Sequence, residues 1–403
     1  MTKELDIVLF GATGFTGRLV AEYLVARRPG VRWALAGRRR RRLELVRSGL
    51  AALDPAAEAL PILVGDSLDR GAMDDIVRRA RVVCSTAGPY AKYGDQVVAA
   101  CVEAGTSYCD ITGETHWIRR MIEAHHARAE ATGARIVHCC GFDSIPSDLG
   151  VLMLHEHLAA QGDRLAEAHG RVILKMPGGL SGGSVATLMS IFENIGDPAV
   201  WRALIDPYAL DPEGSPRGPD RRDFKAPGRD AGSGGWTAPF IMAAINTRVV
   251  RRSNALLGHA YGRDFRYDEA ISTGEGVAGL ARAAGISAAL GGASALAVVP
   301  PGRRLLGRLL PAPGEGPSRE QREQGRFRLE IHARSAAGKK LTGVVAGSHD
   351  PGYGGTAIML GEAALSLAQD DLPAHGGVLT PAVAMGTKLI ERLRAAGETY
   401  RAE

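Results

Sequence analysis

A glycine-rich turn near the start of the chain limits the fold more than any other feature of the sequence. The run Gly-Ala-Thr-Gly-Phe-Thr-Gly at 11–17 directly follows the apolar residues 7–10 and leads into helical spacing over 18–26. Glycines in this pattern permit a tight turn, close approach of the backbone to a pyrophosphate, and close packing of helix on strand. The amide groups and the dipole at the start of the helix would then hold the phosphates. The turn therefore predicts a dinucleotide-binding unit.

The first 150 residues continue this pattern by alternating short apolar runs with helical segments. Alternation of this kind predicts βαβ units with right-handed crossovers. We therefore expect an α/β fold with a Rossmann-type, doubly wound parallel sheet. The further strands are expected at 33–36, 59–64, 82–85, 107–109 and 135–138, and the further helices at 96–104 and 117–131.

The pattern changes after residue 150, which predicts a second domain. We expect a Rossmann domain at 1–150, completed by 352–403, and a substrate-binding α+β domain at 151–351 inserted before the C-terminal helices. Residues 206–235 are rich in Pro, Gly, Arg and Asp, which predicts a long surface loop. The other expected elements are a strand at 168–176, a hairpin of 327–334 with 341–346, and helices at 184–193, 356–368 and 380–395.

The end of the second strand indicates which nicotinamide cofactor binds. An acidic residue there would bind the ribose hydroxyls of NAD, but here Arg38 and Arg39 open a run of arginines to Arg42. Arginine can stack on adenine and pair with a 2′-phosphate, so the sequence favours NADP. The alternatives are a solvated helix start and, less favoured because the run is isolated, a nucleic-acid patch. Asp66 suits a hydrogen bond to the adenine amino group, although an ordinary turn aspartate is the alternative.

Two further clusters follow predicted strands and so should border the cofactor crevice. The first, at 86–94, offers Tyr90 and Tyr93 as proton donors, with packing of the loop as the alternative. The second, at 141–150, offers Asp143 and Ser144 as positioning groups, and its Ser147 or Asp148 could cap the next helix. No Tyr-x-x-x-Lys pair occurs, so the usual short-chain dehydrogenase mechanism cannot be assumed. The histidines show no spacing that favours a metal site.

Residues 277–300 are nearly free of charge and rich in Ala and Gly. The segment is long enough to span a bilayer, but it has few of the residues that favour insertion. We favour a buried pair of small-residue helices. The alternatives are an apolar surface at 277–310 that contacts lipid or acyl chains, and a true membrane span.

Composition sets further bounds on this 403-residue chain. Five unspaced cysteines are typical of reduced, buried thiols in an intracellular protein. No signal peptide precedes the first strand, so we expect a cytoplasmic protein, with peripheral membrane contact as an alternative. The formal charge of +5 permits a nucleic-acid partner without requiring one, and we predict none. The oligomeric state stays open.

Taken together, the motifs resemble the saccharopine dehydrogenase-like oxidoreductases, in particular the branch of trans-acting enoyl reductases in actinobacterial lipid synthesis. The resemblance rests on the glycine turn, Ala36-Gly37-Arg38, and the segments 86–94, 108–114 and 141–150. It also includes the segments 181–184, 352–357 and 377–381, and is poorest between 206 and 317.

The resemblance implies NADPH-dependent reduction of a C=C bond in a polyketide or fatty acyl thioester, presented by the carrier domain of a polyketide synthase. The alternatives are a saccharopine-type C–N dehydrogenase acting on an amino acid, and a non-enzymatic NADP-binding module at lipid surfaces. Chain length of the substrate and the proton donor stay open. Carried over by position, the cofactor contacts are Gly11, Thr13, Gly14, Phe15, Thr16, Gly17, Arg38, Thr86, Ala87, Gly88 and Pro89.

Overall fold

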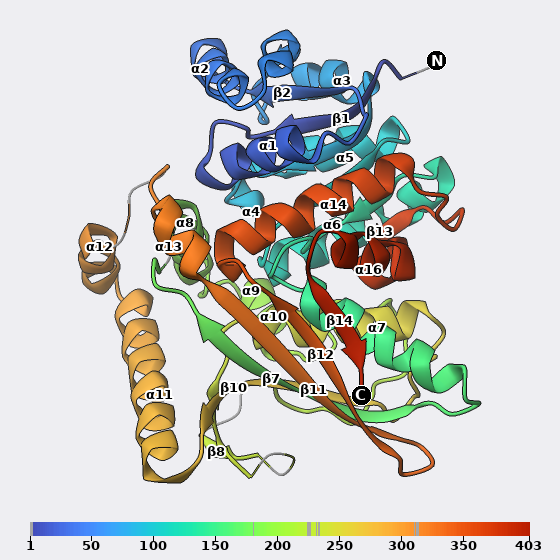
Figure 1. Cartoon of the computed structure of the whole chain (residues 1–403), viewed down its shortest axis with the longest axis vertical. Helices are drawn as coiled ribbons and strands as arrows, with labels where there is room; N and C mark the ends of the chain where they lie inside the picture. The colour runs from blue at the N-terminus through green and yellow to red at the C-terminus, as the bar shows by residue number, and fades with distance from the viewer. Residues whose placement is uncertain are drawn as a thin grey trace.

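The computed structural model contains two seven-stranded sheets with helices packed around them (Figure 1). It describes residues 3–179, 181–223, 227–230, 232, 234–309, 311 and 314–403. The first sheet is wholly parallel and has the strand order β3-β2-β1-β4-β5-β6-β13. This is the Rossmann order, and it confirms the predicted fold class. Its strands are β1 (Leu5–Phe10), β2 (Trp33–Gly37), β3 (Ile62–Val64), β4 (Ala80–Ser85), β5 (Ser107–Asp110), β6 (Arg135–Val137) and β13 (Gly377–Leu379).

Strand β1 shows why this sheet needs helices on both faces. Ile7 and Leu9 lie in one hydrophobic cluster, while Val8 and Phe10 lie in the other. All four are 2% exposed or less, because a parallel strand at the centre of a sheet is buried on both sides. The helices of this domain are α1 (Phe15–Arg27), α2 (Arg40–Ala51), α3 (Arg70–Arg78), α4 (Tyr90–Tyr93), α5 (Asp95–Glu103) and α6 (Thr115–Thr132), with the short η1 (Pro55–Ala59).

The C-terminal part of the chain returns to this first sheet. Strand β13 pairs with β6, and helix α14 (Thr356–Gln369) packs against α1, β4 and β5. Helices α15 (Pro381–Ala384) and α16 (Gly386–Ala395) follow, and η2 (Pro351–Gly355) precedes α14. The last strand, β14 (Thr399–Ala402), departs from the expected division because it pairs with β12 of the other sheet.

The second sheet is mixed and has the order β14-β12-β11-β7-β10-β9-β8. Helix α7 (Ile145–Ala159) leaves the first domain and packs on β7, β11 and β12. The predicted hairpin is β11 (Arg326–Ser335) with β12 (Lys340–Gly347). The other elements of this region are β7 (Leu165–Lys175), β8 (Gly228–Arg229), β9 (Trp236–Pro239), β10 (Arg266–Gly274), α8 (Gly182–Glu193), α9 (Pro198–Ile205), α10 (Ala243–Leu256), α11 (Gly276–Val298), α12 (Pro300–Leu309) and α13 (Arg319–Gln324).

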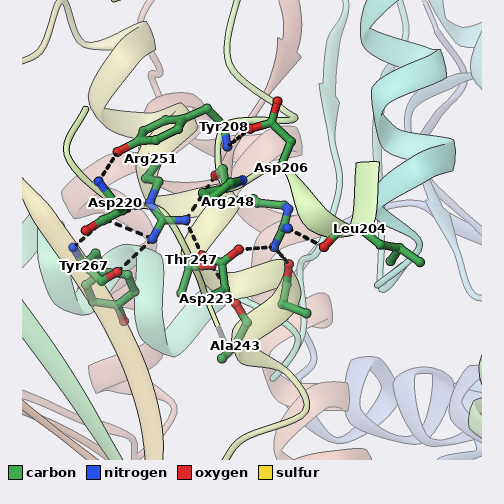
Figure 2. Close-up of polar contacts among 12 residues, drawn as sticks. Leu204, Asp206, Tyr208, Asp220, Asp223, Ala243, Thr247, Arg248, Arg251 and Tyr267 are labelled. Atoms are coloured by element: carbon green, nitrogen blue, oxygen red, sulfur yellow. Dashed lines mark hydrogen bonds and ion pairs between the residues drawn. The ribbon is translucent and has the colours of Figure 1, made fainter. Parts of the chain in front are cut away.

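The described part of 206–235 is held more tightly than the predicted surface loop (Figure 2). Arg251 on α10 donates to Asp220 at 3.0 Å and pairs with Asp223, and Arg248 pairs with Asp223 at 2.7 Å. Arg248, Arg251 and Asp223 are all buried. A buried charge that loses its partner is strongly destabilising. These ion pairs therefore hold the segment in one conformation against α10. The composition of the segment alone predicted an exposed loop, because the arginines that pair with it lie on α10, in another part of the sequence.

Asp148 lies in the core between α7, α10 and α15, and it does not cap the following helix as the sequence suggested, because it lies within the first turn of α7 and instead accepts from an amide in the first turn of α15. Its carboxylate accepts hydrogen bonds from Ser253 Oγ at 2.5 Å and from the backbone amide of Ala382 at 2.8 Å. Burial raises the pKa of Asp148 to about 7 from an ordinary value of 3.8. Helix α7 begins one residue after Ser144, and Ser147 is buried within it.

This shift predicts how the free energy of unfolding depends on pH. Because the pKa of Asp148 is raised in the folded state, its contribution is present below about pH 3.8 and is lost as the pH rises to about 7. Over that range, Asp148→Asn should reduce the pH dependence of the unfolding free energy by about 1.4 kcal/mol per pH unit. The asparagine oxygen can accept from the amide of Ala382 and its amide group can donate to Ser253 Oγ, so the variant should fold. Urea denaturation of both proteins at several pH values measures the difference, and equal slopes would contradict it.

Helix α11 corrects a prediction. The sequence favoured a buried pair of helices at 277–300, but the structure has one long helix, and only 11% of its most apolar 18-residue window is buried. Helix α12 follows it at the same edge of the molecule (Figure 1). Among the described residues, α11 is the one helix long and apolar enough to cross a membrane by length and composition.

The cysteines match the prediction made from their spacing. All five are buried and free.

Candidate active site

The glycine turn joins β1 to α1 as the sequence predicts. Gly11 has a φ of +86°, a conformation that favours glycine, and a Cβ there would lie 2.9 Å from the amide nitrogen of Ala87. Gly14 is the N-cap of α1 and has no side chain with which to cap the helix. The first amides of α1 are therefore left for an anion such as a pyrophosphate. At Gly17, a Cβ would clash with the carbonyl oxygen of Gly11, so close packing of helix on turn requires glycine.

Segments from the last quarter of the chain contact this turn and the start of α1. The ring of Phe15 meets the ring of Tyr353 edge-on, with centroids 5.1 Å apart. The guanidinium of Arg322 lies 5.6 Å from the centroid of the Phe15 ring. Arg18 donates to the carbonyl oxygens of Thr13 and Gly314, each at 3.2 Å. The edge of the cofactor turn is therefore built from both parts of the chain.

Positive charge is concentrated where β2 ends. Arg38 and Arg39 are exposed, and Arg40 begins α2, whose first turn carries no acidic residue. Cations beside the positive end of a helix dipole are unfavourable unless an anion neutralises them. A 2′-phosphate would do so, which is the group expected here from the sequence. Asp66, in contrast, is exposed, and its carboxylate accepts from the amide of Leu68 at 3.1 Å, as an ordinary turn aspartate does.

Arg38→Gln is expected to weaken NADPH binding about twentyfold and to leave NADH binding nearly unchanged. The loss corresponds to one charge-assisted hydrogen bond of about 1.8 kcal/mol, with Arg39 still in place. Titration calorimetry with each cofactor gives the two dissociation constants. Arg78→Gln, at the exposed end of α3, removes the same charge elsewhere on this domain and should change neither constant. Equal losses for NADPH and NADH would contradict the role given to Arg38.

The loop after β4 is fixed by contacts from both sides. Thr86 Oγ1 donates to the carbonyl oxygen of Gly11 at 3.1 Å, which holds this loop against the glycine turn. Glu114 accepts from the amides of Tyr90 and Ala91 at 2.6 and 3.1 Å and so caps the short helix α4. Burial raises the pKa of Glu114 to about 7. Residues 86–89 are thereby placed at the carboxyl end of β4, next to the turn, where the sequence predicted cofactor contacts.

The two tyrosines of this loop are poorly placed to act as acids. Tyr90 is 3% exposed, and its hydroxyl donates to the carbonyl oxygen of Ser85 at 3.0 Å. Burial holds the pKa of Tyr90 well above its usual value. The ring of Tyr93 lies 5.5 Å from the guanidinium of Arg38, at the end of the site predicted for the 2′-phosphate. Tyr93 therefore lies beside Arg38, the residue to which the sequence assigns the 2′-phosphate.

The side chains of Asp143 and Ser144 lie in different surroundings. Ser144 is fully buried and its hydroxyl donates to the side chain of Asn246 at 3.0 Å, so it faces the second domain and not the crevice. Asp143 is half-buried, and a Cβ on Gly113 would lie 4.0 Å from its Oδ1 and 3.9 Å from Met242 Cε. The carboxylate therefore lies beside the loop after β5, where the two domains meet.

The surroundings of Asp143 suit a group that exchanges a proton near neutral pH. Burial is the largest cause that raises its pKa to about 7, and the nearby charge of Asp110 adds to the shift. Asp110 is itself buried and bonded to His138 Nδ1 at 2.8 Å. A carboxyl group with a pKa near 7 can act as an acid at physiological pH.

Sequence reasoning missed residues that α8 and η2 bring to this crevice. Tyr353 lies in η2, and its hydroxyl accepts from the amide of Ser181 and lies 3.1 Å from Ser184 Oγ. A Cβ on Gly88 would lie 3.7 Å from Thr187 Oγ1. Ser184 and Thr187 are three residues apart on α8 and so share a face. The segments 181–184 and 352–357 were signalled by the resemblance, but no role followed from their residues alone.

The loop that carries Asp143 contacts the same region. The amide of Phe142 donates to Thr356 Oγ1 at 3.1 Å, directly after η2. The loop that carries Asp143 thus contacts the residue directly after η2, and η2 in turn contacts α8 through Tyr353 and Ser184.

Comparison with known proteins agrees with this geometry. Residues 7–137 match the family model of the saccharopine dehydrogenase NADP binding domain. The chain is 43% identical to a protein of Mycobacterium tuberculosis named as a trans-acting enoyl reductase, covering 98% of this chain and 96% of that one. It is 41% identical to a trans-acting enoyl reductase of Mycobacterium ulcerans, covering 98% and 97%.

A solved structure adds the fold of the whole chain. Apo saccharopine dehydrogenase of Saccharomyces cerevisiae superimposes with a TM-score of 0.53 at 12% identity, covering 99% of both chains. This likeness concerns the two-domain fold alone, whereas the 41–43% identity to the mycobacterial relatives extends over nearly the full chain. The chain belongs to the trans-acting enoyl reductase family, and its Rossmann domain is a saccharopine dehydrogenase NADP-binding domain.

Proposed function

We propose that the protein reduces the C=C bond of an α,β-unsaturated acyl thioester, with NADPH as the reductant. The observation that carries this proposal is the similarity over nearly the full chain to reductases of that name. Those relatives are named as acting in trans. We accordingly propose that the acyl chain of this protein's substrate arrives on the carrier domain of a separate polyketide synthase.

The chemistry divides between the cofactor and the protein. NADPH, when bound, supplies a hydride for the β-carbon of the thioester. We assign its pyrophosphate to Gly11, Gly14 and the first amides of α1, and its 2′-phosphate to Arg38 and Arg39. The protein must then supply a proton to the α-carbon, and Asp143 is the group we propose for this step. Its raised pKa keeps a substantial fraction of the carboxyl protonated at neutral pH, and its partial exposure lets water restore the proton.

Helix α8 is the second part of this proposal. Ser184 and Thr187 lie on the face of α8 that meets Tyr353 and the loop at Gly88. We propose that this face lines the acyl site and that its hydroxyl groups orient the thioester carbonyl. Most of the apolar side chains of α8 are half-buried, which suits a surface that contacts an acyl chain.

The test is consumption of NADPH with substrates of two classes. With enoyl thioesters of graded chain length, the protein should oxidise NADPH and release the saturated thioester. With lysine and 2-oxoglutarate, the pair that a saccharopine-type dehydrogenase joins, it should oxidise none. Turnover of the amine pair without turnover of any enoyl thioester would reject the proposal.

A further inference from the structure

Helices α11 and α12 form an apolar surface that the described residues of the chain leave largely exposed. Of the residues of α11, only Gly279, Ala283 and Ala297 are buried. The exposed surface continues through the corner between the two helices and along α12. Its large exposed apolar side chains are Val277, Leu280, Leu296, Val298, Val299, Leu305 and Leu309, which are 41–83% exposed.

Charge on this surface has one sign. Arg282 lies on α11, and Arg303, Arg304 and Arg308 lie on α12, while no acidic residue occurs from 276 to 314. Apolar side chains beside arginines are the combination that binds an anionic lipid surface. Within α11 and α12 a second copy of this chain would bring arginines together without a carboxylate to pair them, and the nearest acidic residues in sequence, Glu275 and Glu315, lie outside both helices. The composition therefore favours lipid over self-association.

Anchoring at both ends argues that the helix lies on a membrane and does not cross it. At the start of α11, Thr273 Oγ1 donates to the carbonyl oxygen of Gly279 at 2.9 Å, beside β9. Beyond α12, the carbonyl oxygen of Glu315 accepts from the amide of Gly182 at 3.1 Å, and that of Gly314 accepts from Arg18. A helix of 23 residues is about 35 Å long, enough to span a bilayer. A spanning α11 would carry its far end across the bilayer, away from the body of the protein to which Gly314 and Glu315 are bonded.

We propose that α11 and α12 seat this protein on an anionic lipid bilayer. The apolar side chains enter the interface, and Arg282, Arg304 and Arg308 contact the lipid phosphates. Helix α11 also packs on α8, whose Ser184 and Thr187 face the crevice. The surface that we propose to contact lipid therefore lies next to α8. Binding to lipid needs no substrate, so this inference stands apart from the proposed reaction.

The test uses the full chain with Ser294→Cys, an exposed position on α11, labelled with a polarity-sensitive dye. The native cysteines are buried and should stay unlabelled. Vesicles that contain phosphatidylglycerol should shift the emission of the dye to the blue, and vesicles of phosphatidylcholine alone should not. Ser48→Cys, exposed on α2 of the other domain, is the matched control and should show no shift with either vesicle.

The arginines supply the second measurement. Arg304→Gln with Arg308→Gln should weaken binding to the anionic vesicles about thirtyfold, since each arginine near such a surface contributes about a fivefold factor. Arg78→Gln with Arg81→Gln removes the same charge from the Rossmann domain and should leave binding unchanged. Retained NADPH binding shows that each variant is folded. Equal binding to both kinds of vesicle, no binding to either, or a dye shift that depends on protein concentration without lipid would each overturn the proposal.

Discussion

Replacing Asp143 with asparagine is expected to lower kcat for an enoyl thioester by about 10²–10⁴-fold, the usual contribution of a positioned acid. The amide has nearly the same size, so the loop at 141–150 should keep its contacts, including the bond from Phe142 to Thr356. The dissociation constant for NADPH should not change, because Asp143 lies beside the loop after β5 and away from the glycine turn. Steady-state kinetics and a cofactor titration separate the two effects.

The pH profile tests the same residue in a second way. Asp143 must be protonated to act as the acid, and burial raises its pKa to about 7. The kcat of the wild-type protein should therefore be constant below about pH 7 and fall about tenfold per unit above it. Asp143→Asn should lose this decline along with most of the activity. Asp264→Asn, at an exposed turn, is the matched control and should behave as wild type. Wild-type kcat in the Asp143 variant, or an unchanged profile, would exclude it as the proton donor.

Gly14→Ala is expected to reduce the affinity for NADPH about 100-fold with little change in stability. Gly14 has φ −72° and ψ 169°, which alanine adopts freely, and its Cβ would meet only the carbonyl oxygen of Gly11, at 3.3 Å. The added methyl group therefore has room in the protein itself. It would point into the space where the backbone must approach the pyrophosphate, and overpacking of this kind costs about 1–3 kcal/mol.

A second glycine provides the control for this experiment. Gly49 lies on α2 with nothing near its missing side chain, so Gly49→Ala should stabilise the helix by about 0.5–1 kcal/mol and leave cofactor binding unchanged. Calorimetry and thermal melting of both variants give the comparison. A Gly14→Ala protein that binds NADPH as wild type does would mean that the pyrophosphate does not lie at this turn.

The Rossmann domain could be predicted from sequence because its signals are local. The strand, turn and helix at 5–27 follow from the placing of three glycines and from burial of β1 on both faces. Strand β13 was missed because three residues, Gly377–Leu379, are too short to show a periodicity, and their pairing with β6 is set by chain returning from the second domain. The pairing of β14 with β12 in the other sheet is also set by residues far apart in the sequence, so no local pattern indicates it.

The candidate site was predictable only in part, for a related reason. Asp143 and Ser144 are adjacent in sequence, and only the packing of α10 shows that Ser144 turns toward Asn246. Tyr93 was predicted to border the nicotinamide, but its ring contacts Arg38, the residue predicted to bind the 2′-phosphate, and no local pattern in the sequence indicates that contact. The small residues of α11 suggested burial, but packing covers only its first turns and its far corner. Composition does not show whether a partner surface exists.

The most direct test of the account is reduction of an enoyl thioester in heavy water with ordinary NADPH. A hydride taken from the cofactor and a proton passed through Asp143 from solvent predict one deuterium at the α-carbon of the saturated product and none at the β-carbon. Mass spectrometry or NMR of the product distinguishes the two positions. A product with solvent deuterium at the β-carbon, or no saturated product with any enoyl thioester, would contradict the proposed enoyl reduction.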